Sequence, residues 1–268
     1  MHVTFDTNVI NPLACPDMYE KTCPDMVSVD VIRESIQSGR IHAYLSEAST
    51  SLEAISNEER VDSFLRQFAS GKIPIQPPKP SSERIRVFSE AIQLGLRVLH
   101  APRLGLTTFI EFPETAWAED TNYLIDERQH RYHEYIRFQP DTGVETIKRL
   151  DAELIGIHGL GATHLSTLPS SPIAANSMWK GLLAEYGSPI KFKSKKKFLA
   201  EFRDRVAEWF DMDIQASHYA YGHDYLCTFD SGSKAGPSAI MHPNRVSINS
   251  SRFGIQIVSP SELVALIT

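Results

Sequence analysis

Five acidic side chains lie where a β-prone run ends or where a predicted helix begins. Asp6 directly follows the run 2–5, and Asp230 directly follows the run 225–229. The other three are Glu53, Asp211 and Asp213. Ligands of open parallel sheets bind at the carboxyl ends of the strands, so acids that are far apart in the sequence can meet there. We therefore expect these carboxylates to converge on one site.

A group of neighbouring carboxylates has a specific chemical requirement. Carboxylates within ~5 Å of one another repel and raise each other's pKa. A divalent cation removes that repulsion, and ligand sets made of oxygen favour Mg²⁺ or Mn²⁺ over softer metals. Taken singly, each Asp could equally serve as a helix cap or a strand stop. Their shared placement, without a His and Cys quartet at zinc spacing, favours a site for a hard cation.

The elements that must position these acids alternate between strands and helices, which predicts an α/β fold around a mostly parallel sheet. Predicted strands cover 2–5, 41–46, 96–99, 225–229 and 254–258. Predicted helices cover 28–38, 51–55, 58–70, 82–92, 114–137, 144–157, 174–186, 195–210, 213–221 and 260–267. The polar stretch between Asp230 and Gly254 is predicted to be a loop. Strands near both ends of the chain and a helical middle indicate one sheet with a large insertion.

Length, composition and charge exclude several classes of protein. The chain has 268 residues, 42% of them hydrophobic, which is too apolar for a disordered chain. No stretch approaches the ~18 consecutive apolar residues of a membrane span, and the first residues lack the order of a signal peptide. The three cysteines cannot all pair, which favours the cytoplasm. The net charge of −6 argues against a broadly basic nucleic-acid coat.

A cluster of lysines within residues 191–197 is a local exception to this acidic balance. Its members are Lys191, Lys193, Lys195, Lys196 and Lys197. A solvated, basic helix start explains such a run on composition alone. Because the cluster leads towards Asp211 and Asp213, contact with the phosphates of a nucleic acid is the competing interpretation.

Four segments, in this order, resemble the motifs of the PIN-domain family. They are the apolar strand ending in Asp6-Thr7-Asn8, the Thr-x-x-Glu at 50–53, the helix and strand from Asp211 to Thr228-Phe229-Asp230, and the last strand ending in Pro260. The resemblance covers roughly 1–70 and 209–268. It implies a three-layer α/β/α fold and a single PIN-like domain over 1–268, with a core at 1–72 and 209–268 and a helical insertion at about 73–208.

The same resemblance implies a divalent-metal-dependent nuclease, with RNA as the expected substrate. Mg²⁺ or Mn²⁺ would lower the pKa of a bound water that attacks the phosphodiester in line. The metal ligands would be Asp6, Glu53, Asp213 and Asp230, with Asp211 as the other candidate for the third acid. Asn8 and Thr228 would orient carboxylates or phosphate oxygens.

Two assignments within this pattern stay open. Measured back from Gly222, the usual helix length of the family selects Asp211, whereas the small residues that follow Asp213 fit the helix face better from Asp213. The spacing from Ser46 to Glu53 is one residue longer than expected, which makes Glu47 a remote substitute for Glu53.

The expected partner is single-stranded or structured RNA, bound in part by the lysine cluster, without a membrane. Similarity to toxin-like members of the family adds a homodimer and an antitoxin or other protein as candidate partners. The alternative is a catalytically inactive PIN-like scaffold that binds RNA or protein. Elsewhere in the chain, His130 and His133 are expected on a solvated helix face, His218 in the interior, and Asp224 in a structural role.

Overall fold

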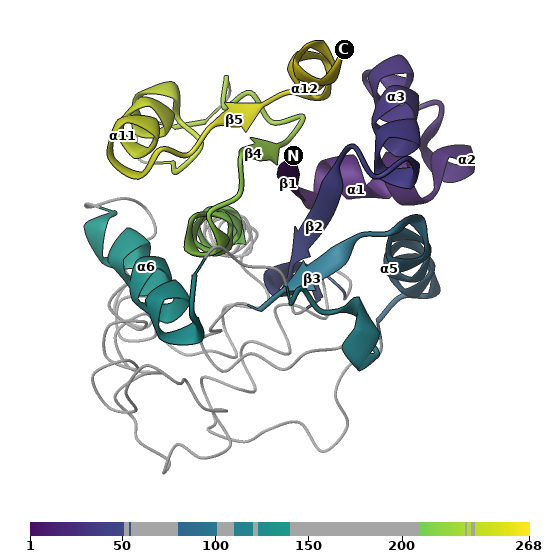
Figure 1. Ribbon diagram of the computed structural model, residues 1–268. Helices are drawn as coiled ribbons and strands as arrows, with labels where there is room; N and C mark the ends of the chain where they lie inside the picture. Colours follow the sequence, from purple (N-terminus) through teal and green to yellow (C-terminus); the bar gives the residue numbers. More distant parts are fainter. Residues whose placement is uncertain are drawn as a thin grey trace, which may run out of the picture.

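The computed structural model describes residues 1–50, 54, 80–100, 110–119, 123–139, 210–233, 235–236 and 239–268, and the structural statements below concern these. Their strands form one five-stranded parallel sheet in the order β3-β2-β1-β4-β5. The strands are β1 (His2–Phe5), β2 (His42–Ser46), β3 (Arg97–Leu99), β4 (Tyr225–Cys227) and β5 (Ile257–Val258). The chain builds β1, β2 and β3 in one direction and then crosses to β4 on the other side of β1 (Figure 1).

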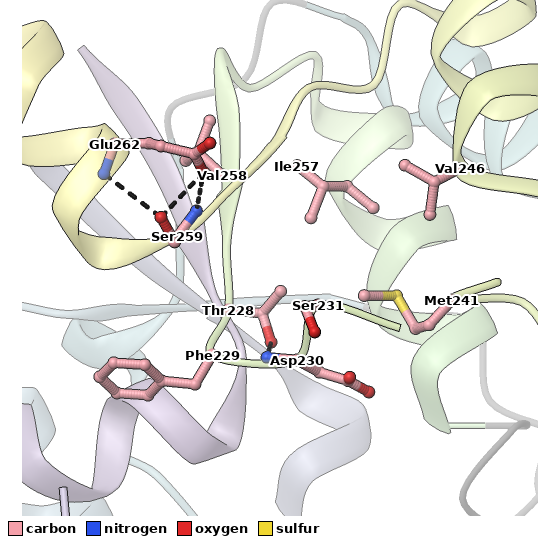
Figure 2. Close-up of a pocket in the computed structure, with 10 residues that line it drawn as sticks. All are labelled: Thr228, Phe229, Asp230, Ser231, Met241, Val246, Ile257, Val258, Ser259 and Glu262. Carbon is pink, nitrogen blue, oxygen red and sulfur yellow. Dashed lines mark hydrogen bonds between the residues drawn. The ribbon is translucent and has the colours of Figure 1, made fainter. Parts of the chain in front are cut away.

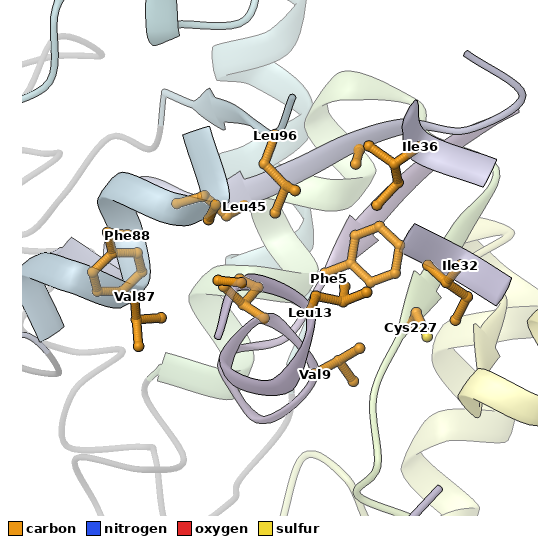
Figure 3. Packing of buried hydrophobic residues seen from close by; sticks show 14 of the residues in the cluster. Phe5, Val9, Leu13, Ile32, Ile36, Leu45, Val87, Phe88, Leu96 and Cys227 are labelled. Atoms are coloured by element: carbon orange, nitrogen blue, oxygen red, sulfur yellow. The ribbon is translucent and has the colours of Figure 1, made fainter. Parts of the chain in front are cut away.

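One face of the sheet is apolar. Because side chains alternate across a strand, Val3 and Phe5 of β1 share this face, where Leu45 and Cys227 are also fully buried. Helices cover it, and residues such as Val9, Leu13, Ile32 and Phe88 fill the space between helices and sheet (Figure 3). These helices are α1 (Thr7–Ala14), α3 (Met26–Gln37), α5 (Ser82–Leu94) and α12 (Pro260–Ile267), with the short α2 (Pro16–Tyr19) after α1.

The opposite face of the sheet is polar and packs against the helical residues 210–221. Thr4 of β1 lies on this face, and its Oγ1 is 3.1 Å from His218 Nδ1 and 2.9 Å from His223 Nδ1. Ser46 Oγ of β2 lies 3.3 Å from Ser217 Oγ. Hydroxyl and imidazole groups therefore join this face of the sheet to residues 210–221. Apolar packing joins the other face to α1 and α3.

Two further helices, α6 (Ile125–Phe138) and α11 (Pro243–Phe253), lie on the outer side of residues 210–221 (Figure 1). The Tyr135 hydroxyl of α6 donates to Gln215 Oε1 at 2.7 Å and accepts from Asn249 Nδ2 at 2.9 Å. Burial raises the pKa of Tyr135 far above its usual value. Helices therefore cover both faces of a parallel sheet, as the alternation of elements predicted.

Local sequence explains where several helices begin. The Ser81 side chain accepts from Arg84 N at the start of α5, and Asp25 accepts from Ser28 N at the start of α3. At α12, Ser259 and Glu262 form a reciprocal capping box in which each side chain bonds the other residue's backbone N–H. Gly222 ends the helix over 210–221 with a φ of +67°, which confirms the predicted helix end.

The structure corrects several predicted elements. The stretch predicted as a loop after Asp230 contains α11, which begins at Pro243, a favourable first helical residue. Within 114–137, a 3₁₀ turn (Glu114–Ala116) and α6 replace one long helix. α1, directly after β1, was not predicted. β4 and β5 are shorter than the predicted strands.

The predicted insertion at 73–208 contains two elements of the core. α5 packs against α1, and β3 pairs in parallel with β2 at the edge of the sheet. The core therefore includes α5 and β3, and 73–208 is not an insertion throughout. Most of the predicted helices 58–70, 144–157, 174–186 and 195–210 lies outside the described residues.

None of the helices in the described segments is long and apolar enough to cross a membrane. The three cysteines are free thiols, with Cys15 and Cys227 buried.

Candidate active site

Asp6 lies at the carboxyl end of β1, between the strand and α1. Its backbone N–H donates to Cys227 O at 3.0 Å, which extends the pairing of β1 with β4 by one bond. By position Asp6 is the N-cap of α1, yet its side chain makes no capping hydrogen bond. Its carboxylate Oδ2 instead accepts from Asn8 Nδ2 at 2.6 Å and from Thr228 Oγ1 at 2.7 Å. The capping interpretation of this acid is therefore excluded.

The orientation of Asn8 follows from its partners. Phe229 N donates to Asn8 Oδ1 at 3.0 Å, and a backbone N–H can only donate. The amide nitrogen of Asn8 must then face the other way, towards Asp6 and towards Thr228 Oγ1, which it reaches at 3.0 Å. Asn8 thus donates through its amide nitrogen and accepts through its amide oxygen, and it links the first turn of α1 to the end of β4.

The hydroxyl of Thr228 is fully used. It donates to Asp6 and accepts from Asn8 Nδ2 and from Asp230 N at 3.0 Å, which is the one donor and two acceptor positions that a hydroxyl offers. Residues 220 or more positions apart in the sequence are joined here. Asn8 and Thr228 thus both contact the Asp6 carboxylate, one of the groups that they were predicted to orient.

The register of the sheet places three polar residues side by side at its carboxyl edge. Phe5 pairs with Leu45 of β2 and with Cys227 of β4. The next residues along each strand are Asp6, Ser46 and Thr228. Because the strand order reverses between β1 and β4, this is the topological switch point at which open α/β sheets bind ligands.

Asp213 approaches the same edge from the helical layer. It is 4% exposed and lies one helical turn before Ser217, which contacts Ser46 and donates to Asp213 O at 2.8 Å. Because Ser217 faces the sheet at Ser46, Asp213 lies on the sheet-facing side of the helix, one turn closer to the N-terminus of the helix.

Asp211 occupies a different side of the same helix. It lies one turn before Gln215, the residue that bonds Tyr135 of α6, and it is half-buried. Its charge adds to the effect of burial in raising the pKa of the Tyr135 phenol, which places it near α6. The helix thus turns Asp213 towards the sheet and Asp211 towards α6, and this geometry favours Asp213 as the third acid.

Asp230 follows β4 on an exposed turn. Its backbone N–H bonds Thr228, and its Oδ1 accepts from Gly232 N at 2.8 Å. Gly232 has a φ of +66°, and a Cβ at this position would collide with the carbonyl oxygen of Met241. The turn therefore requires glycine, and it holds the Asp230 carboxylate within the same loop as Thr228.

Other predicted site residues fall outside the described part of the chain. These are Glu53 and the five lysines of the cluster at 191–197. Glu47, the substitute for Glu53, is described: it is 8% exposed in the 3₁₀ turn Glu47–Thr50 directly after β2. Burial raises the pKa of the Tyr221 phenol, and the nearby Glu47 carboxylate adds to that rise. Among the residues that the structure describes, no group of three or more His, Cys, Asp or Glu side chains is placed to hold a metal ion.

The histidines outside the carboxylate site have structural surroundings. His218 is buried, as predicted, and burial lowers its pKa to about 3. Asp224 accepts from His2 N at 2.7 Å, which agrees with its predicted structural role. The prediction for His133 was wrong: the residue is 2% exposed, neither ring nitrogen has a hydrogen-bond partner within the described part of the chain, and burial lowers its pKa to about 4. Its position on the inner face of α6 explains the difference.

Comparison with known proteins adds no assignment. No family model, no curated protein and no solved structure matches this chain. The function is therefore inferred from the geometry at the carboxyl edge of the sheet.

A pocket next to Thr228 was not predicted from the sequence. Figure 2 shows it between the ends of β4 and β5, the start of α12 and α11, and its volume is about 230 Å³. Thr228 and Asp230 form part of its wall, with Glu262 on the opposite side. The Ser-x-x-Glu at 259–262, a capping-box pattern, was the available signal for a helix start at this point.

Proposed function

We propose that this protein is a divalent-metal-dependent nuclease of the PIN-like type, and that RNA is its substrate. The observation that best supports this proposal is the contact of Asp6 with Asn8 and Thr228 at the switch point of the sheet. A carboxylate that is not used for capping, and that two neutral donors orient, has the surroundings of a metal ligand supported by neighbouring hydrogen bonds.

The donor set fits a hard cation. Asp6, Asp213 and Asp230 offer only oxygen atoms, and Glu53 or Glu47 would add a further carboxylate. Such ligands suit Mg²⁺ or Mn²⁺, which bind through a few carboxylates and retain water for substrate phosphates. When bound, the ion supplies charge stabilisation at the phosphodiester and a water of lowered pKa.

The residues of the chain have separate tasks in this proposal. Asn8 and Thr228 keep the Asp6 carboxylate in one rotamer by using the same oxygen, Oδ2. The buried Asp213 would reach the ion from the helical layer, and the exposed Asp230 would reach it from the open side. The lysines at 191–197 would contact the phosphates of the bound strand and position it without reading its sequence.

The test is cleavage of end-labelled single-stranded RNA by the full chain in Mn²⁺, with the chelator EDTA as the first control. Asp6→Asn should abolish cleavage, because it replaces the ligand while keeping the shape of the side chain. Asp30→Asn alters an exposed carboxylate of α3 and should leave the rate unchanged. If the parent protein and both variants bind RNA but none of them cleaves it, the protein is instead the catalytically inactive scaffold.

A further inference from the structure

The pocket beside Thr228 has an apolar side and a size that limits its ligand. Val246 of α11, Ile257 of β5 and Met241 line one part of it (Figure 2). Its volume of about 230 Å³ lies below the about 300–1,000 Å³ of sites for drug-sized ligands. A flat heterocycle of one or two rings is the class of ligand that suits such a space.

The charged groups that line the pocket are two carboxylates, and neutral hydroxyls such as that of Ser231 complete its polar part. Asp230 lies on one side and Glu262 on the other. Glu262 is fixed, because its Oε2 accepts from Ser259 N at 2.7 Å and from Ser259 Oγ at 2.8 Å. Among the described residues that line the pocket, none is Lys or Arg. The pocket therefore repels phosphate and favours an apolar ring that carries N–H donors.

The pocket is also continuous with the candidate active site. Thr228 forms part of its wall and donates to the Asp6 carboxylate at 2.7 Å. Asp230, the next acid of the site, lines the pocket as well. A group bound in the pocket is thus held directly beside the position at which a phosphodiester would be cleaved.

We propose that this pocket binds a nucleobase that carries an exocyclic amino group, adjacent to the scissile phosphodiester. The proposal rests on the proposed nuclease function and adds a base preference to it. Cytosine and uracil are a matched pair for this test, because cytosine offers an amino donor at the ring position where uracil offers a carbonyl acceptor. A carboxylate accepts from the first and repels the second.

The experiment compares kcat/KM for short oligocytidylate and oligouridylate, cleaved by the full chain in Mn²⁺. We expect a preference for oligocytidylate of about tenfold or more, the size of a good polar base contact. In Glu262→Gln the preference should fall to within about threefold, because an amide can also donate to the uracil carbonyl. The capping box tolerates Gln at this position, so the variant should fold.

Two controls separate the pocket from general effects. Glu34→Gln changes an exposed acid of α3 and should keep the preference. Val246→Phe fills the pocket and should weaken cleavage of oligocytidylate, whereas Ile248→Phe alters a residue of α11 that is 44% exposed and should not.

The outcomes distinguish this proposal from the nuclease proposal. Equal cleavage of both oligonucleotides by the parent protein, abolished by EDTA, would overturn the pocket assignment and leave the nuclease standing. If neither is cleaved, fluorescence anisotropy with the same oligonucleotides decides. Tighter binding of oligocytidylate, lost in Glu262→Gln, would support the pocket although the nuclease proposal has failed, and equal or undetectable binding would overturn it.

Discussion

At the scale of single residues, Thr228 and Asn8 hold the Asp6 carboxylate by hydrogen bonds to its Oδ2. A neutral hydroxyl and a neutral amide both donate to one carboxylate oxygen, Oδ2, and neither places a positive charge beside it. Replacing either partner should therefore weaken metal binding through the loss of positioning.

Thr228→Val removes the hydroxyl at nearly constant volume. We expect Mn²⁺-dependent cleavage to fall by about 10–100-fold, the usual cost of losing a group that supports a metal ligand. The apparent affinity for Mn²⁺ should fall with it. Thr228→Ser retains the hydroxyl and should restore most of the rate. A Val variant with parent activity and parent Mn²⁺ affinity would contradict the positioning role.

The buried histidines predict a pH dependence of stability. Burial lowers the pKa of His218 to about 3 and that of His223 to about 2, whereas both titrate near 6.5 when unfolded. The unfolded chain thus binds more protons below pH 6.5, and the free energy of unfolding falls as the pH drops. By pH 5 the loss is about 2 kcal/mol for each histidine.

Urea unfolding at pH 7 and pH 5 measures this difference. His218→Gln should show a smaller loss between the two pH values than the parent, although the variant is less stable at pH 7. His42→Gln, at an exposed position of β2, should show the full loss. Equal stability of the parent at both pH values would contradict the assignment of neutral, buried imidazoles to His218 and His223.

At the scale of elements, the turn after β4 determines where Asp230 lies. Gly232→Ala places a Cβ against the Met241 carbonyl at a φ of +66°, so the backbone must move. We expect a stability loss of more than about 1 kcal/mol and a reduced rate of RNA cleavage. Gly236→Ala is the matched control, since nothing lies within 4 Å of its added Cβ. A Gly232 variant as stable and active as this control would refute the close approach.

Sequence patterns identified these elements unevenly. β1, β2 and α12 were predicted within a residue, because apolar alternation and a serine cap are local signals. α11 was missed because its sequence 243–253 is polar on most of its surface and buries only Asn249 and Phe253. Its helical state depends on packing against Tyr135 and Phe138, which no local pattern records.

At the scale of the whole molecule, the two faces of the sheet differ: one packs the apolar core, and the other carries the polar residues of the candidate site. The apolar face buries Phe5, Leu45 and Cys227 beneath α1, α3 and α5. The polar face carries Thr4 and Ser46 towards residues 210–221. Because alternation along β1 continues from Thr4 to Asp6, the acid belongs to the polar face.

The candidate site could be predicted only in part. Asp6 was identified by its place at a strand end, Asn8 and Thr228 followed only from the family resemblance, and the structure brings the three together. The choice between Asp211 and Asp213 required the contacts of Ser217 and Gln215, since sequence spacing alone permits either helix face. The pocket at Glu262 joins four elements, which no single segment of sequence reveals.

Thermal unfolding with increasing Mn²⁺ shows whether the proposed acids from both ends of the chain bind one hard cation together. An ion that binds only the folded state stabilises that state by about 2.7 kcal/mol at 100 times its Kd. The Tm of the parent protein and of Asp30→Asn should rise, and that of Asp6→Asn or Asp213→Asn should not. An equal rise in all four proteins, or none in the parent, would contradict a shared site for the cation.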